Sequence, residues 1–326
     1  MMNNNPVGGH AAGTSVSGWI LLQTVRILQA ASNNNYLSWE GLDVNSVKVW
    51  GTYFGPKGGV LPVFQIGQII SVEGTIGQGK QGLAVWATSM VLVQDELGIA
   101  EFEALCYPSV PKEQLEQYIV DLGGYSQCIS DVNLLQLSIK LFEYFRPYLY
   151  TIPAGKAVHE PYRGGLAQHT WEVTGMCAKA MEVKKGLNKD ILIFSALYHD
   201  IGKTQEYTAQ LTWSPNGRLI THSSIVIQLM TDIILTHNID IEPNLFRQVK
   251  HCMLSHHGEH SEIRPATREA MILHYADIMC CKVGHIEEMI RSGNIGGDGW
   301  GKYSNIINQA PYVPELDDRI TCDKIQ

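Results

Sequence analysis

The spacing of apolar residues changes once along the chain, and this change constrains the fold class more than any other feature. From Trp19 to about Gln94, apolar residues form short runs rich in branched side chains, punctuated by Asn and Gly at 33–35 and 77–82. That pattern is typical of β-strands joined by turns. Beyond the segment LCYPSVPKEQ the spacing becomes that of amphipathic helices, as far as about Gly284. With 326 residues, the chain is long enough for two domains, each with its own core.

Four stretches of the first part have strand patterns: 19–28, 46–54, 68–76 and 83–93. Such short strands predict a small barrel or a sandwich, and a five-stranded oligonucleotide-binding (OB) barrel has about this length. We therefore predict a multidomain α and β protein, with a small OB-like β-barrel over residues 18–100 followed by an all-α helical bundle. Residues 1–17 contain neither a basic segment nor an apolar one, so we predict no signal peptide but a flexible leader.

Helical patterns dominate the second part. Asp131 precedes apolar residues at helical spacing and is a predicted N-cap of a long helix over 131–150. Further amphipathic runs cover 166–183, 189–200, 221–237, 242–256 and 265–290. We expect a helical linker over 101–150, the functional helical domain over 151–290 and an irregular C-terminal tail over 291–326.

Composition excludes some functions. A formal charge of -8 argues against binding nucleic acid through bulk electrostatics, so a polyanion has to be held locally or through metal. The seven cysteines include no C-x-x-C pair, and Cys280 and Cys281 are adjacent, which suits reduced thiols in a cytoplasmic protein. The sequence contains no run of about 18 apolar residues, so we predict no membrane-spanning segment and no membrane partner.

Histidines and aspartates occur at or near the ends of the helical apolar stripes: His169, His199 with Asp200, His222, His256 with His257, and Asp277. Asp277 lies on the same helix side as Leu273 and Cys280, and a carboxylate buried there needs a partner. Mixed imidazole and carboxylate ligands suit borderline divalent metals. Because the set exceeds what one ion needs, we predict two ions, with Mn²⁺ favoured and Fe²⁺, Co²⁺, Zn²⁺ or Mg²⁺ as alternatives.

A single histidine on a helix is more often an ordinary hydrogen-bonded residue than a ligand, and we assign that role to His10, His237, His260, His274 and His285. Lys203 and Arg163 flank the predicted ligands. Such cations are usually solvated, but beside a metal centre they can take up charge on phosphate oxygens. The candidate catalytic residues are therefore Asp200, Lys203 and Arg163.

The stretch HDIGK at 199–203, with His169 before it and Asp277 after it, resembles the signature of the HD superfamily of metal-dependent phosphohydrolases. The additional His222, His256 and His257 resemble its two-metal subset. IPAGKAVHEPYRGGLAQHT, LSHHGE and EAMILHYAD are similar to segments of the YhaM-type 3'-5' exoribonucleases, which also carry an N-terminal OB domain. The resemblance covers about residues 18–285.

One position departs from that family. Where it usually has two adjacent histidines, this chain has His159 followed by Glu160, and both are kept as additional candidate ligands. For Glu160 the alternative is that it accepts a hydrogen bond. The resemblance implies that one ion is held by His169, His199, Asp200 and Asp277. Asp200 is then shared with a second ion held by His222, His256 and His257.

The resemblance implies a 3'-5' exonuclease that releases mononucleotides from single-stranded RNA, with DNA as an alternative, by water activated at two metals. It also implies a homo-oligomer. Alternatives stay open: a nucleotide or cyclic-nucleotide phosphohydrolase, an HD relaxase-like protein of a mobile element, which shares the pattern GGLAQHTWEV, or a non-catalytic nucleic-acid-binding protein.

The barrel would deliver the substrate. OB folds stack bases on aromatic side chains along a cationic groove. Candidate nucleic-acid-binding residues are the aromatic Trp39, Trp50, Tyr53 and Trp86 with the cationic Lys48 and Lys80.

Overall fold

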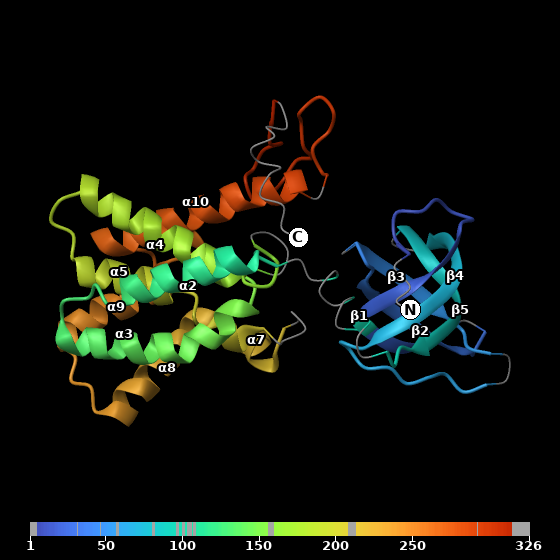
Figure 1. Ribbon diagram of the computed structural model, residues 1–326, viewed down its shortest axis with the longest axis horizontal. Coiled ribbons are helices and arrows are strands. Elements are labelled where there is room, and N and C mark those ends of the chain that lie inside the picture. Colours follow the sequence, from blue (N-terminus) through green and yellow to red (C-terminus); the bar gives the residue numbers. More distant parts are fainter. Residues whose placement is uncertain are drawn as a thin grey trace. The chain divides into compact units, whose positions relative to one another are not determined.

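The chain divides into two compact units, Met1–Pro108 and Ser109–Gln326, in a computed structural model (Figure 1). The structure describes residues 5–30, 32–45, 47–56, 59–79, 82–95, 98–99, 102, 106, 109–155, 160–207, 213–291 and 293–314. Within these ranges no helix is both long and apolar enough to cross a membrane.

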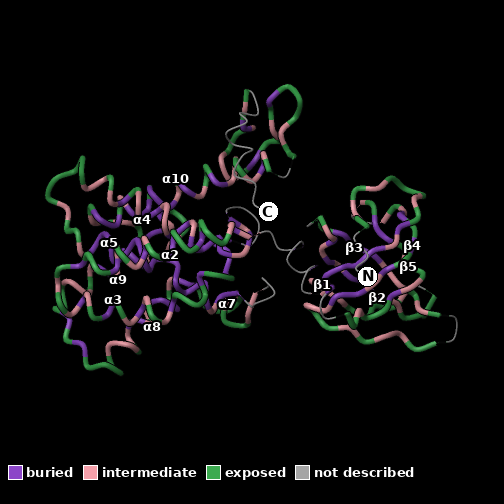
Figure 2. Tube along the Cα trace, viewed as in Figure 1, coloured by how far each residue is buried: buried purple, intermediate pink, exposed green. Residues whose placement is uncertain are grey.

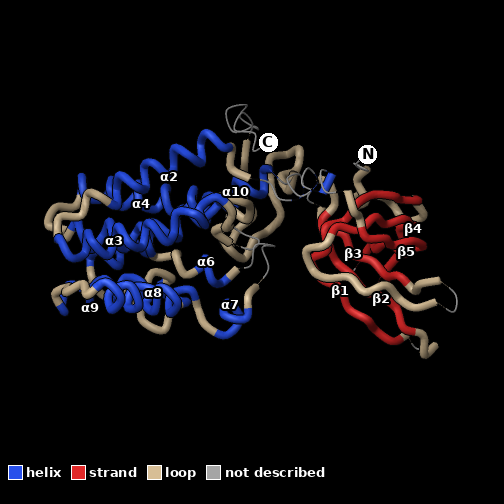
Figure 3. The backbone as a smooth tube through the Cα atoms, turned by 60° about the horizontal axis from the view of Figure 1, so that its bottom comes forward, coloured by secondary structure: helices blue, strands red, loops and turns tan. Residues whose placement is uncertain are grey.

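The first unit is a closed barrel of five strands: β1 (Ser15–Gln29), β2 (Asn35–Leu42), β3 (Lys48–Tyr53), β4 (Ile69–Gly79) and β5 (Gly82–Leu92). The strand order is β1-β2-β3-β5-β4, and β1 closes the barrel by pairing with β4 along its first half and with β2 along its second (Figure 3). The pair β3 and β5 is parallel and the others are antiparallel. This closed five-stranded barrel, in which β5 lies between β3 and β4, is OB-like, as the sequence predicted.

Strand β2 is the one that the sequence pattern did not single out. Its burial alternates with a period of two, with Leu37 and Trp39 inside. Two asparagines before it, a third at its first position and the small residues within it dilute the apolar signal. Gly41 contributes through close packing, because a Cβ there would lie 2.3 Å from Ile20 Cγ2.

The segment before the barrel differs from the flexible leader expected over residues 1–17. Strand β1 begins at Ser15, and Val7 is buried in the barrel core. The buried Asp43 holds this segment, since its Oδ2 accepts hydrogen bonds from the backbone amides of Val7 at 3.0 Å and Gly8 at 2.8 Å. Its Oδ1 accepts from the amides of Asn45 and Val47, so all four bonds satisfy one buried carboxylate.

The second unit is helical: α2 (Lys112–Ser126), α3 (Val132–Phe145), η1 (Arg146–Tyr150), α4 (Gly165–Val183), α5 (Lys189–Tyr198), α6 (Lys203–Glu206), α7 (Pro215–Leu219), α8 (His222–His237), α9 (Pro243–Ser255), η2 (Gly258–His260) and α10 (Arg268–Arg291). Each of the six predicted helical segments contains an α-helix, although the segment 131–150 is α3 followed by the 3-10 helix η1 and not one long helix. Asp131 caps α3 as predicted, accepting from the amide of Leu134 at 2.8 Å.

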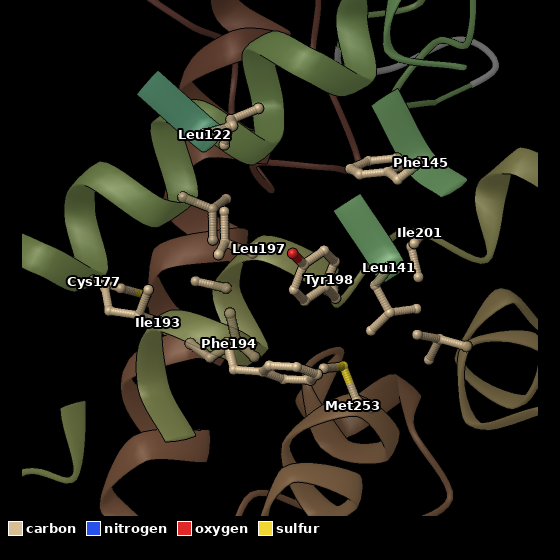
Figure 4. Close-up of a cluster of buried hydrophobic side chains, with 14 of the residues drawn as sticks. Leu122, Leu141, Phe145, Cys177, Ile193, Phe194, Leu197, Tyr198, Ile201 and Met253 are labelled. Carbon is tan, nitrogen blue, oxygen red and sulfur yellow. The ribbon is translucent and has the colours of Figure 1, made fainter. Parts of the chain in front are cut away.

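Helix α5 is the centre of this unit, because every residue from Ile191 to Tyr198 is buried (Figure 2). A helix that is apolar on all sides needs neighbours on all sides. Leu122 of α2 and Leu141 of α3 belong to the same apolar cluster as Phe194 (Figure 4). These helices were expected within a linker over 101–150; instead they form part of the core, because their apolar stripes need α5 for burial.

The chain after α10 forms isolated β-bridges, including Trp300 with Tyr312. His285 of α10 bonds to this segment through Nε2, which lies 2.8 Å from Ser304 Oγ. This contact fixes the segment against the end of α10.

Candidate metal centre

Five elements or their ends bring the predicted ligands to one place in the helical unit. Helix α4 supplies His169, and α10 supplies Asp277. His199 and His256 directly follow the last residues of α5 and α9, and His222 begins α8. The side chains form two groups whose donor atoms lie within 4.8 Å of one another: Asp200 with His222, His256 and His257, and His169 with His199 and Asp277.

Within each group the imidazole Nε2 atoms face one another. His169 Nε2 and His199 Nε2 are 3.4 Å apart, as are His222 Nε2 and His256 Nε2. Asp277 Oδ1 lies 3.2 Å from His169 Nε2.

Asp200 joins the two groups through its two oxygens. Its Oδ1 is 3.4 Å from His222 Nε2 and 3.7 Å from His256 Nε2. Its Oδ2 is 3.4 Å from His199 Nε2 and 3.6 Å from His169 Nε2. One carboxylate therefore faces both groups, as a shared ligand would.

The protonation pattern shows that these residues fit a cation. His199 Nδ1 lies 2.9 Å from the carbonyl oxygen of Ala196, and His256 Nδ1 lies 2.7 Å from that of Met253. A carbonyl only accepts, so in the neutral rings Nδ1 carries the proton and Nε2 presents a lone pair to the centre. Asp200 Oδ1 is also buried there without a hydrogen-bond partner among the described residues. Lone pairs and carboxylate oxygens that face one another need a positive charge between them, and borderline divalent metals accept this donor set.

Burial and charge separate the histidine pKa values. Burial lowers the pKa of His199 to about 4 and that of His257 to about 2, so both are neutral at physiological pH. Burial acts in the same direction on His169, but the carboxylates of Asp277 and Glu160 outweigh it and raise its pKa to about 10. The pKa of Asp277 is lowered although burial opposes this, chiefly because it accepts a hydrogen bond from His169.

Lys203 is buried, and its Nζ lies 2.6 Å from Asp200 Oδ2. Although burial opposes the charged form, this contact raises the lysine pKa, and the ammonium lowers that of Asp200. Arg163 lies outside the two groups and lines a cavity of about 440 Å³ with Lys112 and Tyr150. Its contact with substrate stays a prediction.

Carboxylates also lie behind two of the histidines. Glu160 is buried, and its Oε2 is 3.5 Å from His169 Nδ1, the nitrogen that faces away from the centre. Glu206, which the sequence analysis did not single out, places Oε2 3.2 Å from His222 Nδ1. Its signal is only its position three residues after Lys203. His159 lies outside the described residues.

The histidines of the centre differ in how far their side chains are exposed to solvent. The side chains of His169, His199 and His256 are fully buried, whereas that of His257 is 37% exposed. His257 spans the two groups, because its Nε2 is 2.8 Å from His222 Nε2 and its Nδ1 is 3.6 Å from Asp277 Oδ2.

The candidate nucleic-acid residues of the barrel fall into different environments. The prediction for Trp39 is wrong, because it points inward from β2 and is 2% exposed in the core. Trp50 and Tyr53 are partly buried. Trp86 is 56% exposed, with its indole lying against Gly77 of β4.

The first unit also contains the two predicted cations, Lys48 and Lys80, and one further aromatic pair. Lys48 forms an ion pair with Glu40 at 2.7 Å, and Lys80 lies outside the described residues. Tyr36 and the exposed Phe54 are stacked with centroids 5.0 Å apart. Sequence reasoning missed this pair because its two members are separated along the chain and meet only through the pairing of β2 with β3.

The helical unit with this arrangement of histidines and aspartates contains an HD domain: residues 166–280 match the family model of that description. HD domains bind divalent metals, which agrees with the donor groups above. The chain is similar to the curated 3'-5' exoribonuclease YhaM of Listeria monocytogenes, at 25% identity over 70% of this chain and 73% of the relative. The YhaM protein of Oceanobacillus iheyensis is 26% identical over 69% of this chain and 72% of the relative.

Similarity to a third relative reaches into both units. The YhaM protein of Shouchella clausii is 24% identical over 86% of this chain and 88% of the relative. A solved structure, the second OB-fold domain of replication protein A from Methanococcus maripaludis, covers 26% of this chain and 89% of its own, with 14% identity and a TM-score of 0.21. The strand order of the barrel, and not this likeness, carries the fold assignment.

Proposed function

We propose that the protein is a metal-dependent phosphodiesterase, and specifically a 3'-5' exonuclease that releases mononucleotides from single-stranded RNA. The observation that carries this proposal is that the two carboxylate oxygens of Asp200 face two different groups of inward-facing donors. Sites of two metals are typical of enzymes that displace groups on phosphorus. The named activity of the relatives supports the substrate class.

Two divalent ions would be held by the two groups, with Asp200 shared between them. His169, His199 and Asp277 would hold one ion, and His222, His256 and His257 the other. Bound ions supply neutralisation of phosphate charge and activation of water. The excess of imidazole over oxygen donors favours Mn²⁺, Fe²⁺, Co²⁺ or Zn²⁺ over Mg²⁺, which prefers oxygen ligands.

The chain's own residues prepare the site for an anionic substrate. Lys203 offsets the charge of Asp200 and holds its Oδ2 in place. A phosphodiester can approach the centre at His257, because this histidine is partly exposed whereas the other histidine side chains of the centre are buried or nearly so. With its pKa lowered to about 2, His257 is neutral and presents a lone pair rather than a charge.

The barrel supports the choice of a single-stranded polymer over a free nucleotide. The exposed indole of Trp86 and the stacked Tyr36 and Phe54 offer flat aromatic faces at its surface. Bases stack on such faces with little sequence preference. We expect weak, salt-sensitive binding, since the chain is acidic overall.

The test is product analysis with purified full-length protein. RNA labelled at its 5' end, and the matching single-stranded DNA, are incubated with and without Mn²⁺. A ladder that shortens stepwise from the 3' end, together with free mononucleotides, is the expected result. An intact oligomer alongside hydrolysis of nucleotides or cyclic nucleotides would instead establish a small-molecule phosphohydrolase. Hydrolysis of neither substrate with metal bound would contradict both.

A further inference from the structure

The histidines of the centre differ in what lies behind them. His199 and His256 each direct Nδ1 at a backbone carbonyl oxygen, at 2.9 and 2.7 Å. His169 and His222 instead direct Nδ1 at the buried carboxylates of Glu160 and Glu206. Each group therefore contains one histidine backed by a carbonyl and one backed by a carboxylate.

We propose that Glu160 and Glu206 are paired positioning residues, each of which orients one metal-binding histidine and raises its basicity in one half of the centre. The inference rests on the metal binding proposed above and not on the identity of the substrate. For Glu160 this role corresponds to the hydrogen-bond acceptor among the two roles that the sequence left open, since the side chain faces the outer nitrogen of a ligand.

Glu160 is held for this role by its backbone and by α10. Its φ of 40° lies in the left-handed region, which turns the chain sharply just before α4. Its carboxylate lies against Gly284, where a Cβ would come within 2.2 Å of Glu160 Oε1. Glu160 Oε2 is buried with no hydrogen-bond partner among the described residues, so the histidine 3.5 Å away is the group it faces.

Glu206 reaches His222 from the short helix α6. The same turn places Lys203 on Asp200, so α6 contacts the second group through two side chains. Glu206 Oε2 is also buried without a hydrogen-bond partner among the described residues, and it lies 3.2 Å from His222 Nδ1. Its backbone carbonyl accepts from Ser214, which ties α6 to the start of α7.

A carboxylate behind a histidine has two effects. It keeps the proton on Nδ1, so that Nε2 is free to bind metal, and it increases electron density at Nε2. Removing such a partner typically weakens metal affinity about 10- to 100-fold. Because the two carboxylates serve different groups, each loss should weaken one metal site and spare the other.

The test is calorimetric titration of metal-free, full-length protein with Mn²⁺, with bound metal counted by elemental analysis. Wild type is expected to bind two ions. Glu160→Ala and Glu206→Ala should each weaken one binding step about 10- to 100-fold and leave the other within about threefold. Unchanged titrations for both variants would overturn the proposal, as would equal weakening of both steps by either one.

Conservative variants separate positioning from folding. Glu160→Gln and Glu206→Gln keep an acceptor oxygen of similar size, so they should lose less affinity than the alanine variants. Thermal melting of the metal-free proteins shows whether each alanine variant folds. Where one does not, the corresponding glutamine variant is used for the test instead. A Gln variant that weakens both sites equally would overturn the role of that carboxylate.

Gly284→Ala offers an independent approach, because its new Cβ displaces the Glu160 carboxylate without altering a ligand. It should weaken the same step as Glu160→Ala. Gly175→Ala in α4 is the matched control, since a Cβ there meets nothing within 4 Å, and it should bind metal as wild type does. If the variants behave as expected while wild type degrades no RNA, the proposed substrate fails and the positioning role stands.

Discussion

Lys203 Nζ lies 2.6 Å from Asp200 Oδ2, and both side chains are buried. The pair places a positive charge beside a carboxylate that faces both groups of histidines. His199, Asp200 and Lys203 follow the apolar run of α5 directly, so they lie at the edge of the core. Asp200 Oδ2 lies near both Lys203 and the neutral His199, and burial of either charged member of this network without its partner would be costly.

Replacing Lys203 with Met should destabilise the metal-free protein. The change leaves Asp200 buried without its cation, which typically costs about 3–5 kcal/mol. Chemical denaturation in the presence of a chelator measures the effect. Lys179→Met is the control, because Lys179 pairs with Glu182 at the exposed surface and its loss should leave stability close to that of wild type. Equal stabilities of the two variants would contradict the assignment.

Replacing Asp200 with Ala should abolish hydrolysis and reduce the number of bound Mn²⁺ ions from two to one or none. The reason is that its two oxygens face different groups, with Oδ2 3.4 Å from His199 Nε2 and Oδ1 3.4 Å from His222 Nε2. Asp232→Ala, on the exposed surface of α8, should retain wild-type metal content and activity. Retention of both properties by Asp200→Ala would remove the shared ligand from the mechanism.

Metal binding should release a proton and strengthen with rising pH. In the metal-free protein the pKa of His169 is raised to about 10, so at pH 7 its Nε2 holds a proton that a metal must displace. Affinity for the ion at His169 should therefore rise by up to about tenfold per pH unit between pH 6.5 and 8.5. Calorimetry in buffers of different ionisation enthalpy counts the proton, with His237→Gln as a surface control. Absence of release at pH 7 would contradict the raised pKa.

The same shift predicts how stability depends on pH without metal. A pKa raised in the folded state contributes stability that is fully present below about 6.5, the unfolded value, and is lost as pH rises toward 10. This part of the change should be absent in His169→Gln, which melting curves between pH 7 and 9 can show.

Two tryptophans of the barrel should respond in opposite ways to replacement by alanine. Trp86 is 56% exposed, so its loss should weaken single-stranded RNA binding by about 1–3 kcal/mol with little effect on stability. Trp39 is in the core, so its loss should cost about 3–5 kcal/mol of stability. Filter binding at low salt and denaturation measure these effects, and Trp300→Ala, which removes an exposed tryptophan of the helical unit, is the control. Normal RNA binding by Trp86→Ala would exclude it as a stacking platform.

Local chemistry in the sequence determined the two-part architecture and the helices that carry the ligands. The period of the apolar residues separates strands from helices, and Asp131 marks the start of α3 because capping depends on nearest neighbours. The residues HDIGK with His169 and Asp277 indicated the chemistry, because buried imidazole and carboxylate groups need a common partner.

Tertiary structure alone decided which residues face one another. Trp39 and Trp86 are alike in a list of aromatic residues, and only the closure of the barrel puts one inside and the other outside. The same holds for Glu206, whose neighbour His222 belongs to another helix, and for Val7, which is held by Asp43 from 36 positions away. Such contacts depend on chain segments distant in sequence, so no local pattern of spacing or charge records them.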